Sequence, residues 1–200
     1  EAFVWQMMAA RSYLALGQAK PAAALYQRLQ KQAKSPEQQA QLQLLQAHLL
    51  LAQGNANQAL ILLEGKPDVV LDADTQKDWY RQRVVLQLDI NNKFGAAKSL
   101  ILLEPYLAQN ELSTNHQQIW SLLKSMTPST LQALEEAPAP DVTTGWLWLA
   151  ALVNEFGAQP NQLARQLAGW KQAFPNHPAQ KDMPAGLGDL ATSNISALQQ

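Results

Sequence analysis

The feature that most constrains this chain is a recurrence of similar residues every 37 positions. The recurring residues are Ala10, Leu14, Gly17, Ala22 and Tyr26, then Ala47, Leu51, Gly54, Ala59 and Leu63, and then Val84, Leu88, Asn91, Ala96 and Leu100. Two-helix repeats of roughly 34–40 residues are typical of tetratricopeptide-type solenoids, in which a hairpin buries its apolar face only by stacking on a neighbour. We therefore predict an all-α fold of tetratricopeptide-like helix-hairpin repeats, stacked into an elongated superhelix.

Local signals mark where the helices of each hairpin begin and end. Gly17 and Gly54 are expected just after a helix, where a positive φ costs little without a side chain. Asn91 stands at the third such position, and Asn is the next residue that tolerates this conformation. Ser35 followed by Pro, Glu and Gln predicts a capping box, and Thr127 before Pro predicts a second capped start.

Apolar spacing at three and four residues then predicts ten helices. Their expected ranges are 3–16, 19–33, 37–53, 56–64, 75–90, 94–108, 114–125, 128–136, 143–156 and 160–173. The small Ala22 is expected where the second helix of a hairpin packs closely on the first. Pro138 and Pro140 predict a junction near 137–142 inside one helical-repeat domain over 1–178, and residues 179–200 read as an extended tail.

Composition excludes several classes of protein. A hydrophobic content of 47% argues against disorder, and the absence of cysteine excludes disulfides and cysteine-based zinc sites. A pI of about 6.3 argues against a nucleic-acid partner, because phosphate binding needs a cationic surface. The apolar runs are too short for a membrane span. The net charge of −1 offers no obvious electrostatic steering toward any partner.

Residue types that carry chemistry are sparse and scattered. His48, His116 and His177 lie too far apart in sequence to suggest a metal cluster. Glu135 and Glu136 are adjacent on a helix, so their side chains diverge and form no acid–base pair. No phosphate loop, nucleophile elbow or dinucleotide motif is present. We expect no catalytic residue, no cofactor and no metal.

Two tryptophans are spaced so that they cannot share one face of a helix. Trp146 and Trp148 are two positions apart, which separates their directions on a helix. We expect one to fill the core and take Trp148 as the candidate for an exposed aromatic contact with a partner or a sugar ring.

A set of ordered motifs in the last third of the chain carries a family resemblance. The motifs are Gly145-Trp146-Leu147, then Trp170, then Phe174-Pro175-Asn176-His177-Pro178-Ala179 and Pro184. They resemble the end of the N-terminal domain of the LpoA family, outer-membrane lipoprotein activators of a penicillin-binding protein of the 1A type. The segment from Ile119 to Thr127 and the repeat layout before it are similar too.

The resemblance implies structural roles for the motif residues. Trp146, Trp170, Asn176, His177 and Pro178 match the family's pattern, and we expect them to fill the core and stiffen the end of a helix. The family's binding residues lie largely outside this chain, so none is assigned here.

The resemblance also implies a place and a partner. It implies a periplasmic protein of a Gram-negative bacterium, tethered to the outer membrane by a lipid anchor upstream of Glu1. A second domain, similar to type I periplasmic binding proteins, is expected downstream and makes the main contact with the synthase. The chain is then a piece of a longer, non-catalytic activator of peptidoglycan synthesis, serving as spacer and interaction scaffold, with peptidoglycan as another candidate partner.

Two alternatives remain open at this point. One is the helical superhelix of a soluble lytic transglycosylase, a peptidoglycan-cleaving enzyme. Its catalytic glutamate is expected before a serine, yet none of the eight glutamates in this chain precedes serine. The other alternative is a generic tetratricopeptide scaffold of unrelated function.

Overall fold

The computed structural model describes residues 2–65 and 69–190, and every regular element within them is a helix. The α-helices are α1 (Ala2–Ala15), α2 (Ala19–Gln32), α3 (Pro36–Ala52), α4 (Ala56–Leu62), α5 (Ala73–Asp89), α6 (Lys93–Leu103), α7 (Gln109–Leu123), α8 (Pro128–Ala133), α9 (Val142–Phe156) and α10 (Pro160–Ala173). Two short 3-10 helices are η1 (Glu104–Tyr106) and η2 (Pro178–Gln180). The prediction of an all-α chain with ten helices is confirmed for the described residues.

The chain divides into two compact units, Glu1–Ser99 and Leu100–Gln200, and the boundary falls inside α6. The junction expected near 137–142 lies within the second unit, in the loop between α8 and α9. These two helices pack against each other. The Thr144 hydroxyl on α9 donates to the carbonyl oxygen of Ala137 at 2.5 Å, which ties the loop to the helix that follows it.

The three repeat turns of the first unit have the same geometry. Gly17, Gly54 and Asn91 adopt positive φ angles of 72°, 78° and 58°. The next residue at each turn donates its N–H to a carbonyl oxygen five positions back, in the pairs Gln18 to Tyr13 at 2.8 Å, Asn55 to Leu50 at 2.8 Å and Asn92 to Gln87 at 2.7 Å. This is the Schellman arrangement, which satisfies carbonyl groups at a helix end. The predicted left-handed positions are therefore confirmed, including the asparagine.

The helix starts follow the predicted caps. The Ser35 hydroxyl accepts from the Gln38 N–H at 3.2 Å, and the Gln38 side chain accepts from the Ser35 N–H at 3.3 Å. The Thr127 hydroxyl accepts from the Thr130 N–H. Each cap satisfies a backbone donor that the first turn of a helix leaves without a partner.

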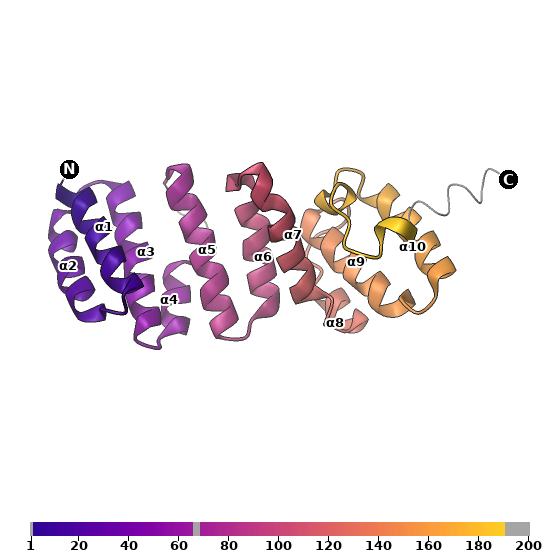
Figure 1. Cartoon of the computed structure of the whole chain (residues 1–200), viewed down its shortest axis with the longest axis horizontal. Coiled ribbons are helices and arrows are strands. Elements are labelled where there is room, and N and C mark those ends of the chain that lie inside the picture. Colours follow the sequence, from indigo (N-terminus) through magenta and orange to yellow (C-terminus); the bar gives the residue numbers. More distant parts are fainter. Residues whose placement is uncertain (1, 66–68, 191–200) are drawn as a thin grey trace. The chain divides into compact units, whose positions relative to one another are not determined.

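Helix α3 belongs to two hydrophobic clusters of the first unit, whose helices lie side by side in Figure 1. The cluster with α1 and α2 consists of Phe3, Met7, Ala10, Ala22, Leu29, Leu42, Leu45 and Leu49. The cluster with α4 and α5 consists of Ala40, Leu44, Ala47, Ala56, Ala59, Leu63, Leu71, Trp79 and Leu86. A helix packed on two sides needs apolar residues on both, which explains why the six leucines of α3 divide between the two clusters.

In the second unit, α9 is the central helix. It packs against α7, α8 and α10. Trp146, Leu147 and Leu149 of α9 are all buried, and the Asp141 carboxylate caps its first turn by accepting from the Thr144 N–H at 2.9 Å. Within the described part of the chain, no helix has the length and apolar content that a membrane crossing requires.

The segment after α10 differs from the extended tail that the sequence suggested. Residues up to 190 include η2, and the side chains of Ala179 and Leu187 are buried. Proline at the start of η2 fixes its φ, and the apolar side chains fold the segment back onto its own unit. The last part of the expected tail, residues 191–200, lies outside the described residues.

The close approach at the repeat alanines gives a first prediction. Ala22 is fully buried between α2 and α1, whereas Ala24 on the same helix is exposed. We expect Ala22→Leu to lower the free energy of unfolding by about 1–3 kcal/mol through overpacking. Ala24→Leu, the matched control, should change it by less than about 0.5 kcal/mol. Urea unfolding followed by circular dichroism measures both, and equal stability of the two variants would contradict the packing described.

Candidate functional site

The motif residues that carry the family resemblance meet around the N-terminal half of α9. The ring centroid of His177 lies 5.0 Å from that of Trp146 and 5.0 Å from that of Trp170, and both contacts are edge-to-face. Phe174 completes the group at 5.7 Å from Trp170. The Trp170 indole Nε1 donates to the carbonyl oxygen of Gly145 at 2.8 Å. Edge-to-face aromatic contacts are stabilising beyond the area they bury, so this cluster fixes the end of α10 against α9.

Gly145 allows the rings of His177 and Phe174 to lie close to the backbone of α9, because it has no side chain. A Cβ atom at this position would lie 2.7 Å from His177 Nε2 and 3.0 Å from Phe174 Cδ1. Such distances are shorter than van der Waals contact, so an alanine would displace the ring. Steric collision with His177 therefore explains why the Gly145-Trp146-Leu147 motif has glycine at its first position.

Both ring nitrogens of His177 are bonded to the backbone. Nε2 lies 2.9 Å from the carbonyl oxygen of Val142 and must donate to it, since a carbonyl oxygen only accepts. Nδ1 accepts from the Ala179 N–H at 3.1 Å. Burial lowers the pKa of His177 to about 4, although the Val142 carbonyl acts in the opposite direction. His177 is thus a neutral structural histidine that joins η2 to the start of α9.

His116 has the opposite electrostatic surroundings. Its Nε2 lies 3.2 Å from Glu104 Oε2, and its Nδ1 lies 3.0 Å from Asp182 Oδ2. The Glu104 carboxylate raises the pKa of His116 above its ordinary value; burial acts to lower this pKa, and Asp182 adds to the rise. The side chain is almost fully buried, and the centroid of its ring lies 5.9 Å from the centroid of the Trp146 ring. His116 therefore lies between η1 on one side and the segment after η2 on the other, and the two carboxylates favour its protonated form.

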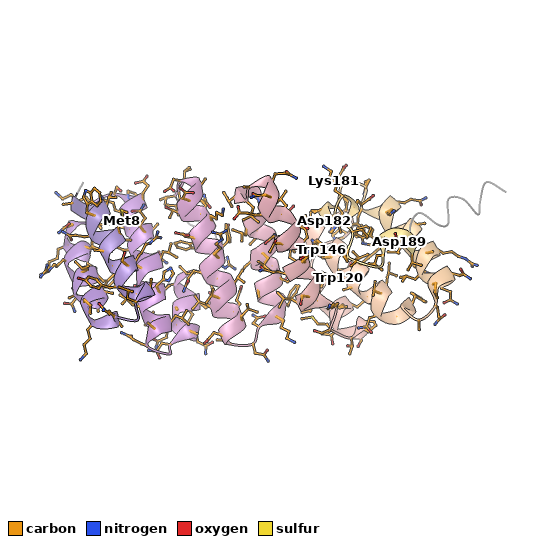
Figure 2. All side chains as sticks on the ribbon, viewed as in Figure 1. Met8, Trp120, Trp146, Lys181, Asp182 and Asp189 are labelled. Carbon is orange, nitrogen blue, oxygen red and sulfur yellow. The ribbon has the colours of Figure 1, made fainter. Side chains whose placement is uncertain are left out.

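Two cavities open beside this ion-pair cluster, and His116 and Asp182 line both. One, of about 470 Å³, is lined by Glu104, Gln109, Leu112, Ser113, His116, Asn176, Pro178, Lys181 and Asp182. The other, of about 410 Å³, is lined by His116, Gln117, Trp120, Ser121, Lys124, Asp182, Met183, Pro184 and Ala185. Figure 2 labels Trp120, Trp146 and Asp182 in this region of the second unit.

The remaining sequence-predicted residues lie around the same cluster. Asn176 is exposed at the rim of the larger cavity, and Pro178 is half-buried at the first position of η2. Trp148 is 38% exposed, unlike the fully buried Trp146. The Trp148 indole donates to Glu135 Oε2 at 2.8 Å, and its ring meets Phe174 edge-to-face. A partner contact through Trp148 stays a prediction.

The contacts of His116 and His177 hold the segment after α10 in place against its own unit. Among the described residues, no group of three or more His, Cys, Asp or Glu side chains is placed to hold a metal ion. In the Glu104–His116–Asp182 cluster, each imidazole nitrogen faces a carboxylate of the chain itself, which leaves no nitrogen directed at a ligand.

Sequence reasoning missed this cluster for a physical reason. Asp182 is 66 residues from His116, and no helical periodicity connects positions that far apart. The family motifs extend from Gly145 to Pro184, so Asp182 lies within the segment that they cover. That position was the only hint in the sequence that Asp182 belongs to this cluster.

Comparison with known proteins identifies the family. A family model described as "LppC putative lipoprotein" matches residues 1–200. The chain belongs to the LppC family.

Curated relatives carry the name penicillin-binding protein activator LpoA. The relative from Vibrio antiquarius is 31% identical over 191 residues, which are 96% of this chain and 32% of that protein. The relative from Photobacterium profundum is 28% identical over 198 residues, which are 99% of this chain and 32% of that protein. The chain thus spans about a third of the length of these relatives.

Solved structures agree on the fold. The crystal structure of the E. coli LpoA amino-terminal domain matches with a TM-score of 0.74 and 24% identity, over 92% of this chain and 82% of that one. Full-length LpoA from Haemophilus influenzae matches with a TM-score of 0.65 and 23% identity, over 95% of this chain and 35% of that one. The predicted helical-repeat fold class and the family resemblance are both confirmed.

The steric role of Gly145 gives a second prediction. Gly145→Ala should lower the free energy of unfolding by about 1–3 kcal/mol, because the new methyl group overlaps His177. Gly169→Ala on α10 is the matched control, since a Cβ there meets nothing within 4 Å. That variant should raise stability by about 0.5–1 kcal/mol through helix propensity. Thermal unfolding compares them, and a stabilised Gly145→Ala variant would disprove the close contact.

The two buried histidines give a third prediction, with opposite pH windows. His177 has a folded pKa of about 4, below the ordinary 6.5, so its contribution to stability is present above pH 6.5 and is lost as pH falls toward 4. His116 has a raised pKa, so its contribution is present below pH 6.5 and is lost as pH rises through its folded pKa. Proton–nitrogen NMR spectra of the imidazole rings follow each titration. Protonation of His177 near pH 6.5 would refute the buried, backbone-bonded ring.

Proposed function

We propose that this chain is the N-terminal helical-repeat domain of an LpoA-type activator of a penicillin-binding protein. The observation that carries the proposal is the match of the LppC family model to all 200 residues, together with relatives named as activators. Since the chain spans about a third of those relatives, activation is a property proposed for the longer protein to which it contributes. The domain acts as a non-catalytic spacer and interaction scaffold in cell-wall synthesis.

The proposal places the protein in the periplasm, tethered to the outer membrane of a Gram-negative bacterium. The lipoprotein description of the family supports this location. A lipid anchor upstream and a binding-protein-like domain downstream complete the protein, and the downstream domain makes the main contact with the synthase. Peptidoglycan is a further candidate partner.

A stacked-hairpin domain suits a spacer because each hairpin is stabilised by its neighbours along the chain. In the second unit, the segment after α10 is held to its own unit by His177, by the His116–Asp182 pair and by the Gln180 side chain, which donates to carbonyl oxygens of Lys171 and Phe174. Because this segment is held against its own unit, it would also fix the position of the domain that follows it. Activation itself requires a coupling free energy of about 1–3 kcal/mol between activator binding and the synthase's active state.

The lytic-transglycosylase alternative has no comparable support. The relatives carry the name of an activator and not of a cleaving enzyme. Glu104, which lines the larger cavity, faces His116 and is followed by Pro105. The generic-scaffold alternative is weakened by the family match over the whole chain.

A cross-linking assay with purified synthase gives the fourth prediction. The 200-residue chain alone should stimulate the synthase little, because the main contact is assigned to the domain that follows. The full-length protein should stimulate the synthase strongly. A truncated protein that lacks this chain should still stimulate the synthase in solution, but it should fail to support growth in cells because the spacer is missing.

Two outcomes would overturn the proposal. Full stimulation by the 200-residue chain alone would place the contact within it. Clearing of purified cell-wall sacculi by the chain would revive the enzyme alternative. Full-length protein with Gly169→Ala, a substitution expected to preserve the fold, serves as the matched control for handling and expression.

A further inference from the structure

The two cavities beside His116 follow one face of α7. The lining positions of this helix run from Gln109 to Lys124, just past its end, in alternating steps of three residues and one residue. Such steps keep side chains on one side of a helix. Since an α-helix rises about 1.5 Å per residue, this lining extends over roughly 22 Å. The cavities adjoin at His116 and Asp182, which line both, and together they form the α7 groove.

The α7 groove lies within the second unit, away from the ends of the described chain. Its lining residues fall between Glu104 and Ala185, and the structure describes residues on both sides of that range. Residues around and after η2 form the wall that faces α7. Figure 2 labels Trp120 in the smaller cavity and Lys181 in the larger one, with Asp182 shared by both. The shape of the groove therefore depends on contacts within one unit.

Most side chains that α7 contributes to the groove are polar. Ser113 lines the larger cavity, Gln117 and Ser121 line the smaller one, and all three are exposed. Amide and hydroxyl groups both donate and accept hydrogen bonds. The apolar residues that α7 contributes are Leu112 and Trp120, both half-buried. The groove thus presents hydrogen-bonding groups at intervals around one large aromatic ring.

Trp120 combines an aromatic surface with an unused hydrogen-bond donor. Among the described residues its indole N–H has no acceptor, whereas the indoles of Trp148 and Trp170 donate to Glu135 and to Gly145. A half-buried indole of this kind can pack against the C–H face of a sugar ring while its N–H donates to a sugar oxygen.

The charged groups that the groove leaves available to a ligand are cationic. Glu104 and Asp182 both face His116, which balances part of their charge. Lys181 lines the larger cavity and Lys124 the smaller one, and both are exposed. Neither lysine forms an ion pair with another described residue. Each cavity therefore offers one ammonium group that can meet a carboxylate of a ligand.

We propose that the α7 groove binds a glycan strand of N-acetylated sugars that bear carboxyl groups, as in peptide-free strands of peptidoglycan. Trp120 would pack on one sugar ring, and Gln117 and Ser121 would bond to its hydroxyl and N-acetyl groups. Lys124 and Lys181 would meet the carboxylates. Cavities of 410 and 470 Å³ are within the range of ligand sites, and a shared groove suits a linear chain of sugars.

A peptide is a poorer match to this lining. Peptides bound along helices rely on apolar anchors that enter a hydrophobic groove. The exposed side chains of α7 in the groove are amides, hydroxyls and a lysine instead, which suits a ligand rich in hydroxyl and amide groups.

The choice of a cell-wall glycan rests on the proposed function, which places the protein beside peptidoglycan but assigns no residue to it. The test is independent of that function because glycan binding needs no synthase. Normal synthase stimulation by the full-length protein together with absent glycan binding would overturn this inference alone.

An NMR titration of the 200-residue chain with three tetrasaccharides tests the proposal. A peptide-free tetrasaccharide from peptidoglycan should bind tightest, and it should shift the indole N–H resonance of Trp120, assigned with Trp120→Phe. The N-acetylglucosamine tetramer lacks the carboxylates and should bind at least about threefold more weakly. The glucose tetramer of cellulose also lacks the N-acetyl groups and should bind more weakly still.

Variants of neighbouring residues locate the site. Gln117→Ala should weaken binding of the peptidoglycan tetrasaccharide by about three- to tenfold through a lost hydrogen bond. Gln118→Ala is the matched control, because Gln118 is exposed on the same helix but does not line the groove. Trp120→Ala should weaken binding by about tenfold or more. Circular dichroism checks that the three variants keep their helices.

Four results would contradict the inference. Equal binding of the peptidoglycan and cellulose tetrasaccharides would remove the N-acetyl and carboxylate recognition. Equal weakening by Gln117→Ala and Gln118→Ala would place binding elsewhere. A peptide released from peptidoglycan that binds in place of the glycan would assign the groove to a peptide. Binding by the 200-residue chain that is absent from the full-length protein would show that another segment of that protein occupies the groove.

Discussion

Burial of a helix between two neighbours is the constraint on which the rest of the first unit depends. A two-helix hairpin has more apolar surface than it can bury by itself, so its stability comes from stacking. Helix α3 shows this directly, because its residues divide between a cluster with α1 and α2 and a cluster with α4 and α5. The fully buried alanines that recur every 37 residues, such as Ala22 and Ala59, are small because two helix axes approach closely there.

In the second unit, the packing of the helices depends on aromatic rings and on one glycine. Trp146 and Trp170 fill the space between α9 and α10, and the edge of His177 fits against Gly145, where a side chain would collide. The segment after α10 is then held by a neutral histidine bonded to the backbone and by His116 placed between two carboxylates. Such side chains would suggest catalysis in another setting, and here their hydrogen bonds and charges fix the path of the chain.

Local rules predicted what local physics determines, and they failed where contacts cross long stretches of chain. The left-handed turns at Gly17 and Asn91 and the capping box at Ser35 follow from backbone sterics and from a few adjacent residues, so the sequence was sufficient. The resemblance drew attention to His177, but the reason for its position, a contact with Gly145, needed coordinates. His116 and Asp182 meet across 66 residues, and no spacing predicts that.

Amide hydrogen exchange would test the central structural claim most directly. If stability comes from packing between two neighbours, the backbone amides of α3 and α9 should exchange slowest, because helices buried on two sides open only with their whole unit. The amides of α1, which packs on one side and is exposed on the other, should exchange faster. Protection of α1 equal to that of α3, or rapid exchange throughout α3, would contradict this account.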